Sequence, residues 1–163
     1  MSDSDEIFLA VEDGVDAVAA RVAEILGVRG EGRRNDETGD WGYVGKGRTV
    51  DAPYGLFVGP NYLGPEAGVL QAMDAYPVTV DVQLRTHKAL QAEEARLAFE
   101  AIVAAMPDVP ALLLHNVEWL VAAYLPGQPT KYFEPRLTPD AEDVDIWGPW
   151  VLRQAESPDP KNP

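Results

Sequence analysis

Few side chains in this chain have the chemistry of a catalyst or a metal ligand. There is no cysteine, and the two histidines, His87 and His115, lack the His-x-x-x-His spacing that binds zinc. No Gly-x-Ser-x-Gly sequence is present to activate a serine. We therefore predict a surface or capping role for both histidines, and no metal, no organic cofactor and no catalytic residue.

Asp81 is the acidic residue whose position best suits acid–base chemistry. It lies in the alternating sequence Val78–Arg85, on the polar side together with Arg85. A carboxylate on a sheet face can act as a general acid, as one of the paired carboxylates of glycosidases does. A cross-strand ion pair is the commoner role for such a residue, and it is the role that we expect.

The glycine-rich stretch at residues 42–47, Gly-Tyr-Val-Gly-Lys-Gly, has some likeness to a phosphate-binding loop. It lacks the Gly-x4-Gly-Lys-Ser/Thr spacing, and no apolar helix follows it. We predict a mobile hairpin tip instead.

A group of acidic and aromatic residues near the C-terminus is the candidate for contact with a partner. It consists of Asp140, Glu142, Asp143, Asp145, Trp147 and Trp150. We expect no calcium loop here, because the central glycine and the glutamate at the twelfth position are missing. In a protein-binding rim, aromatic rings anchor the partner and charges steer it. The alternative is a solvated loop that the two tryptophans hold against the body.

The charge of the whole chain limits its partners. It has 27 acidic and 13 basic residues among 163, a net charge of −14. A field of this sign repels nucleic acid and anionic lipid and attracts basic proteins, although acidic surfaces also serve solubility. The N-terminus does not resemble a signal peptide, and no apolar run is long enough to span a membrane. We expect a soluble, cytoplasmic monomer or weak dimer that binds neither nucleic acid nor membrane.

The first half of the chain combines one strand–helix unit with a region of short strands. The apolar run Ile7–Val11 predicts a buried strand. Asp13, as an N-cap with Asp16 in the capping-box position, predicts a helix that stops at Gly27. Further short strands are expected at Trp41–Val44 and Tyr54–Val58, followed by an irregular or short helical connector at 64–76.

The second half begins with the clearest strand of the chain. Its alternation predicts that four residues face the core: Val78, Val80, Val82 and Leu84. Thr86 is expected to cap a helix that reaches about Met106 and keeps Glu94 mostly outside. A buried strand follows at Ala111–Leu114, and periodicity leaves open whether 118–125 is a strand or a helix. Residues 157–163 are expected to form a disordered tail, which leaves 1–156 as a single domain.

These elements predict an α+β fold. Two helices on one face of a mostly antiparallel sheet bury the apolar faces with few elements. We expect a ferredoxin-like split βαβ arrangement with extra strands.

Two parts of the chain resemble the SitI-type immunity proteins of bacterial toxin–immunity systems. The first is the strand and helix of Ile7–Leu26. The second is the strand Val78–Arg85, the acidic helix with Glu93-Glu94-Ala95-Arg96, the strand Ala111–Leu114, the turn Asn116-Val117-Glu118 and the returning apolar run. The resemblance implies a non-enzymatic cytoplasmic inhibitor that binds and neutralises one cognate toxin. Acidic inhibitors of this kind meet basic toxins by fast, steered association.

Three functions therefore remain open. The first is a binding protein, such as an immunity protein whose partner is a basic toxin domain. The second is a small enzyme that uses carboxylates on the sheet face, which a deep pocket at Asp81 would favour. The third is a structural or accessory subunit.

Overall fold

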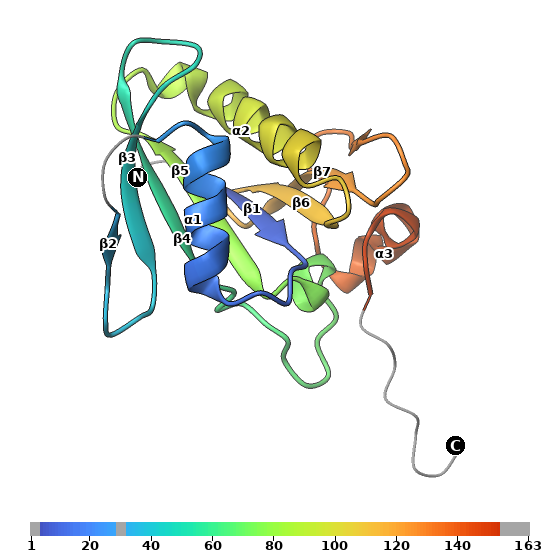
Figure 1. Ribbon diagram of the computed structural model, residues 1–163. Coiled ribbons are helices and arrows are strands. Elements are labelled where there is room, and N and C mark those ends of the chain that lie inside the picture. The colour runs from blue at the N-terminus through green and yellow to red at the C-terminus, as the bar shows by residue number, and fades with distance from the viewer. Residues whose placement is uncertain (1–3, 29–31, 154–163) are drawn as a thin grey trace.

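The computed structural model describes residues 4–28 and 32–153. The strands of these residues form one sheet of eight in the order β2-β3-β4-β5-β1-β6-β7-β8, and each neighbouring pair is antiparallel (Figure 1). The strands are β1 (Asp5–Leu9), β2 (Arg33–Arg34), β3 (Trp41–Lys46), β4 (Pro53–Pro60), β5 (Val78–Leu84), β6 (Ala111–His115), β7 (Trp119–Tyr124) and β8 (Lys131–Tyr132). The α-helices are α1 (Val15–Ile25), α2 (Gln91–Ala105) and α3 (Val144–Trp147). Short 3-10 helices are η1 (Ala72–Ala75), η2 (Lys88–Leu90), η3 (Ala141–Asp143) and η4 (Gly148–Trp150).

The predicted α+β class is confirmed, and the strand order has a ferredoxin-like centre. The elements β1, α1, β4, β5, α2 and β6 occur in this order along the chain, with β2 and β3 inserted between α1 and β4, and they form a split βαβ pair with the sheet order β4-β5-β1-β6. The extra strands β2 and β3 extend the β4 edge, and β7 and β8 extend the β6 edge. Because β7 is a strand, the question left open for 118–125 is resolved.

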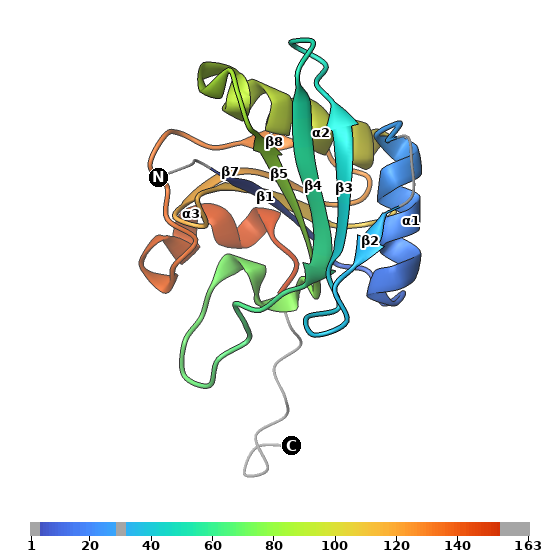
Figure 2. The ribbon, with the colours of Figure 1, turned by 90° about the vertical axis from the view of Figure 1, so that its left-hand side faces the viewer.

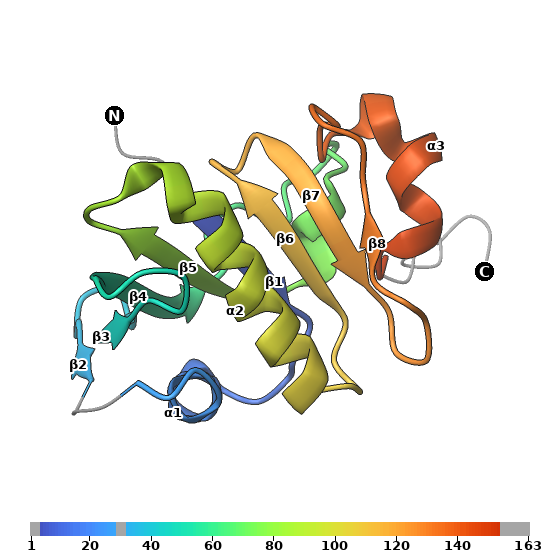
Figure 3. The same ribbon diagram turned by 90° about the horizontal axis from the view of Figure 1, so that it is seen from above.

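The helices α1 and α2 cover one face of the sheet, and α3 lies on the other side (Figure 3). The predicted alternation in β5 is confirmed, because Val78, Val80, Val82 and Leu84 are all buried in the core beneath α1 and α2. Ile7 from β1 belongs to the same core. The sheet register is therefore fixed by burial, since a shift of one residue would turn these side chains to the opposite face.

The opposite face is covered over only part of its width. Phe8, Leu112 and Leu114 pack there against Tyr76, which follows η1, and against Trp147 of α3. In Figure 2, β3, β4 and β5 stand in front of α2, and none of the described helices lies in front of them. Residues of β3, β4 and β5 that point away from α1 and α2 form what we call the open face.

The helix starts differ from the prediction. Gly14, not Asp13, occupies the N-cap of α1 without a side-chain cap, and its carbonyl accepts the hydrogen bond of the Val18 N–H. Thr86 does not cap α2, because η2 intervenes and α2 begins at Gln91. In both places a turn of different geometry precedes the helix, which the identity of one polar residue does not reveal.

Two further predictions were wrong. Residues 42–46 belong to strand β3, and the hairpin tip starts only at Gly47. Glu94 is 2% exposed, because its carboxylate accepts hydrogen bonds from the Arg48 and Thr49 N–H groups and from the Thr49 hydroxyl. The predicted tail, 157–163, and the domain boundary before it lie outside the described residues.

Candidate functional site

A row of residues runs from β2 to β1 and crosses the open face between them. The register places Arg33 opposite Gly42, Gly42 opposite Phe57, and Phe57 opposite Asp81. Asp81 is in turn opposite Glu6. Adjacent strands are about 4.8 Å apart, so the row is about 19 Å long. It carries a cation at one end, an aromatic ring in the middle and two carboxylates at the other end.

A cavity of about 270 Å³ lies over the carboxylate end of this row. We call it the acidic hollow and define it by Glu6, Asp40, Phe57, Tyr62 and Asp81, which all line it. Asp40 reaches it across Gly59, where a Cβ atom would lie 1.6 Å from Asp40 Oδ1. The Tyr62 hydroxyl donates its single proton to the Thr38 carbonyl at 2.7 Å, and its oxygen also lies 3.3 Å from Asp40 Oδ1. A glycine at position 59 is therefore required for Asp40 to reach the hollow.

Glu6 is the deeper of the two paired carboxylates. Its side chain accepts hydrogen bonds from the Ser4 hydroxyl at 2.5 Å and from the Val117 N–H at 3.0 Å, and the residue is 5% exposed. Burial raises the pKa of Glu6 to about 7, the two hydrogen bonds oppose the shift, and the charges of Asp81 and Asp5 add to it. Glu6 therefore exchanges its proton close to neutral pH.

Asp81 is incompletely hydrogen-bonded. Its Oδ2 accepts from Gln83 Nε2 at 3.0 Å, whereas its buried Oδ1 has no hydrogen-bond partner in the described part of the chain. Burial raises the pKa of Asp81 to about 6, with the Gln83 hydrogen bond opposing the shift and Asp5 and Asp40 adding to it. A buried oxygen of this kind favours a ligand that can donate a hydrogen bond.

The predicted cross-strand ion pair of Asp81 is not formed among the described residues. Among the described residues Asp81 makes no ion pair, and Arg85 lines a different cavity.

The histidines have different surroundings. His87 is exposed and takes the N-cap position of η2. His115 is half-buried at the end of β6, where its Nδ1 lies 2.8 Å from Oδ1 of the buried Asp5. Asp5 also accepts a hydrogen bond from Gln91 Nε2 at 2.7 Å. Since these residues come from β6, β1 and α2, this group ties the second helix to the sheet.

The C-terminal candidates are divided between the surface and the core. Trp147 is 1% exposed, and its indole N–H donates to the Asp140 carbonyl at 3.0 Å. It therefore does not offer its side chain to a partner, which corrects the prediction of an anchor. Trp150 is half-buried, with the Lys131 ammonium 5.4 Å from the centre of its ring. Asp143 accepts hydrogen bonds from the Thr138 N–H and hydroxyl.

The remaining acids of this group, Asp140, Glu142 and Asp145, are exposed. The C-terminal group therefore exposes acidic side chains, but neither of its tryptophans is fully exposed.

Most of the acidic hollow was missed by the sequence analysis. The sequence indicates Asp81 as a candidate, but it does not indicate Glu6, Asp40, Phe57 or Tyr62 as site residues. The alternation around Ile7 indicates that Glu6 points away from the helices, which was the one usable signal. That Glu6 meets Asp81 depends on strand pairing between distant parts of the chain.

Within residues 4–28 and 32–153, no three or more acidic or histidine side chains are placed to hold a metal ion. None of the helices found there has the length and apolar character needed to cross a membrane. The chain matches no known protein family, and no similar curated protein or solved structure was found.

Proposed function

We propose that this protein is a non-enzymatic cytoplasmic binding protein that receives a basic side chain of a protein partner in the acidic hollow. The observation that carries the proposal is that Glu6 and Asp81, paired across β1 and β5, both line the acidic hollow, and that Asp81 Oδ1 has no hydrogen-bond partner among the described residues. An arginine or lysine of the partner supplies both the hydrogen-bond donor and the positive charge that this pair lacks.

The aromatic residues that line the acidic hollow also suit a basic side chain. Phe57 is 39% exposed and Tyr62 is 65% exposed, so two aromatic rings border the carboxylates. A cation gains further attraction from the face of an aromatic ring. Exposed aromatic rings around a small polar pocket are also typical of the centre of a protein interface.

The charge of the molecule and the family resemblance point to the same class of partner. A net charge of −14 attracts a basic protein and speeds the encounter. The resemblance to SitI-type immunity proteins makes that partner a basic toxin domain, which binding neutralises.

The protonation of Glu6 and Asp81 provides a measurable signature of cation binding. Glu6 and Asp81 hold protons with pKa values of about 7 and about 6 when the hollow is empty. A bound cation lowers both pKa values, so binding releases protons between about pH 5 and pH 8. Affinity therefore rises with pH across this range and levels off above it.

The test compares the wild-type protein with Asp81→Asn and with the control Asp145→Asn, which removes an exposed acid elsewhere. Each is immobilised and exposed to extract of the host, and the retained basic protein is purified and titrated calorimetrically in two buffers of different ionisation enthalpy. We expect Asp81→Asn to weaken binding at least about tenfold, or about 1.4 kcal/mol, and Asp145→Asn to bind as the wild type does. Equal affinity of Asp81→Asn and wild type overturns the proposal.

The toxin–immunity form of the proposal has its own test. Expression of the captured protein alone should arrest growth, and co-expression of the wild type should restore it. Co-expression of Asp81→Asn should restore growth poorly at matched protein levels. A captured protein that is harmless when expressed alone contradicts the immunity role.

The acid pair also favours a second candidate, an enzyme that uses Glu6 and Asp81 as proton donor and acceptor. Two adjacent carboxylates with raised pKa values in an open cavity are a common form of acid–base site. The two functions differ in one measurement. In an enzyme, Asp81→Asn abolishes turnover of a bound small molecule but leaves its binding largely intact.

A further inference from the structure

A second and larger cavity lies on the other side of Phe57, toward β2 and β3. Its volume is about 640 Å³, within the range of sites that take small organic ligands. We call it the cationic hollow, because Arg33 and Arg85 both line it together with Phe57, Gly42 and Val44. It is distinct from the acidic hollow, in which we propose that the partner's basic group binds.

Among residues 4–28 and 32–153, the two arginines have no acidic partner. In the part of the chain that the structure describes, neither Arg33 nor Arg85 forms an ion pair or a side-chain hydrogen bond. Two other cations of the strands β2 and β3 do have acidic partners. Arg34 pairs with Asp16 at 3.3 Å and with Asp36 at 3.0 Å.

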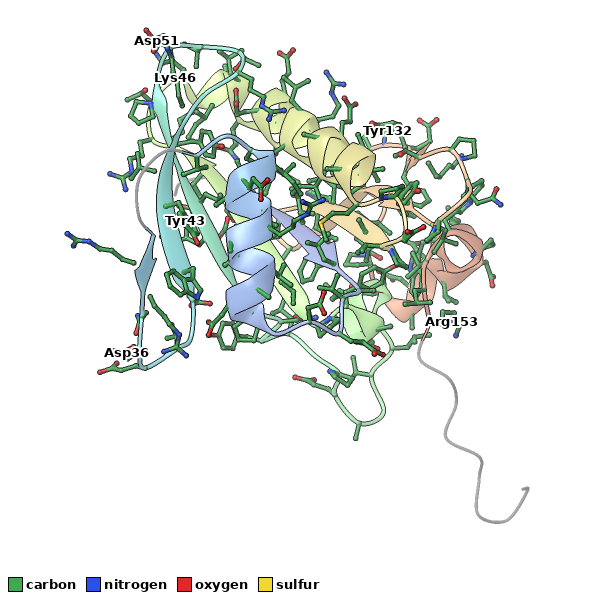
Figure 4. The ribbon with its side chains drawn as sticks, in the orientation of Figure 1. Asp36, Tyr43, Lys46, Asp51, Tyr132 and Arg153 are labelled. Carbon is green, nitrogen blue, oxygen red and sulfur yellow. The ribbon has the colours of Figure 1, made fainter. Side chains whose placement is uncertain are left out.

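Lys46, at the end of β3, pairs with Asp51 at 3.4 Å across the hairpin tip (Figure 4). In a chain with 27 acidic residues, two cations left without an acid at one cavity indicate room for an anion from outside.

Two glycines, Gly42 and Gly55, leave space for the Phe57 ring beside the cationic hollow. A Cβ atom at Gly42 would lie 3.5 Å from the Phe57 ring, and one at Gly55 would lie 3.0 Å from it. The ring therefore leans over two glycines on adjacent strands, while 39% of the residue remains exposed. An exposed ring held against a glycine surface is a platform on which a second planar group can stack.

We propose that the cationic hollow binds a small aromatic anion. Its planar ring stacks on Phe57, and its phosphate or carboxylate group meets the guanidinium groups of Arg33 and Arg85. The guanidinium fork suits both oxyanions. Asp40 and the paired Arg34 are the other charged residues that line the cavity, and Asp40 disfavours a second negative group at its end.

The test uses small probes and needs no protein partner. The ¹⁵N-labelled protein is titrated with phenyl phosphate and with benzoate, and amide and arginine Nε signals are followed. Both probes carry a ring and an anion, so the comparison shows which oxyanion is preferred. Inorganic phosphate lacks the ring and benzyl alcohol lacks the charge. We expect shifts at Gly42, Val44, Phe57 and the two arginines, with at least one aromatic anion binding tenfold or more tightly than either incomplete probe.

Variants separate this site from general charge effects. Arg33→Ala combined with Arg85→Ala should reduce affinity tenfold or more, and Phe57→Ala should abolish the preference for an aromatic probe. Arg153→Ala is the matched control, because Arg153 is exposed and lies far from Tyr43 at the edge of the cationic hollow (Figure 4). The spectra themselves show whether each variant is folded. Absence of shifts at millimolar probe, or equal binding of inorganic phosphate and phenyl phosphate, overturns the proposal.

Discussion

The buried carboxylates of this protein differ in how completely their oxygens are hydrogen-bonded. Glu94 accepts three hydrogen bonds from the hairpin loop, and Glu6 accepts one on each oxygen. Asp81 accepts one from Gln83, and its Oδ1 has none in the described chain. A carboxylate that only stabilised the fold would be fully paired, because a buried unpaired oxygen is destabilising. Asp81 is therefore the residue on which the proposed binding function rests most directly.

This assignment predicts that Asp81→Asn stabilises the isolated protein at high pH. The folded state holds the Asp81 proton up to about pH 6, whereas the unfolded chain loses it near pH 4, so stability falls as pH rises between these values. An asparagine side chain does not ionise, so the variant does not lose stability in this way as the pH rises. We expect the variant to match the wild type at pH 4 and to exceed it by about 1–2 kcal/mol at pH 8, in urea unfolding followed by tryptophan fluorescence. A variant that is less stable at pH 8 than the wild type contradicts the assignment.

At the level of elements, the helix α2 holds both the sheet and the β3–β4 hairpin. Gln91, at its start, is hydrogen-bonded to Asp5 of β1 and to the Val82 carbonyl of β5. One turn later, Glu94 binds the backbone of the hairpin loop. The open face thus depends on a helix that lies on the other side of the sheet.

We predict that Glu94→Ala loosens the hairpin without unfolding the domain. Loss of its hydrogen bonds leaves the Arg48 and Thr49 N–H groups unpaired, at a cost of about 1–3 kcal/mol. Hydrogen exchange of these two amides should speed up markedly. The exposed neighbour Glu93 provides the control, since Glu93→Ala should leave their exchange unchanged. Unaltered protection in Glu94→Ala is the result that contradicts this role.

The strand β5 gives the second element-scale prediction. Val80 is fully buried, so Val80→Asp places an unpaired carboxylate in the core at a cost of several kcal/mol, against a total stability of about 5–15 kcal/mol. We expect the thermal transition to be lost. Val44→Asp is the matched control, because Val44 is 58% exposed on the open face. A folded Val80→Asp variant with an unchanged melting temperature would falsify the register.

On the scale of the whole molecule, the exposed acids near the C-terminus and the proposed contact at Asp81 belong to different segments of the chain. The exposed acids Asp140, Glu142 and Asp145 lie in the C-terminal segment, whereas the unpaired buried oxygen lies on the open face. Exposed charges act mainly on the rate of encounter, and buried polar contacts act mainly on the rate of dissociation. The two groups should therefore have different kinetic effects on binding of the captured partner.

We predict that neutralising Asp140, Glu142 and Asp145 together slows association and weakens its dependence on salt, because exposed charges are screened beyond about 8 Å at physiological ionic strength. Dissociation should change little. Asp81→Asn should have the opposite effect, with faster dissociation and nearly unchanged association. Stopped-flow measurements at two salt concentrations distinguish the two patterns. A triple variant that dissociates faster while Asp81→Asn does not would move the contact to the C-terminal segment.

The sequence by itself determined the fold class, because the signals for it are local. Alternation over Val78–Leu84 predicts one buried face wherever the strand is placed, and the spacing of apolar residues predicts the two long helices. Boundaries such as Gly14 and Gln91 were displaced, since a capping preference is weak beside the geometry of the preceding turn.

Only the tertiary structure decided the site. Glu6 and Asp81 become neighbours because β1 is inserted between β5 and β6, a long-range pairing that local pattern does not encode. Composition also could not tell that Trp147 points inward while the acids beside it point outward. The pKa of Asp81 and its missing hydrogen bond likewise depend on what surrounds it. Burial and register are properties of the assembled sheet, and both hollows are consequences of them.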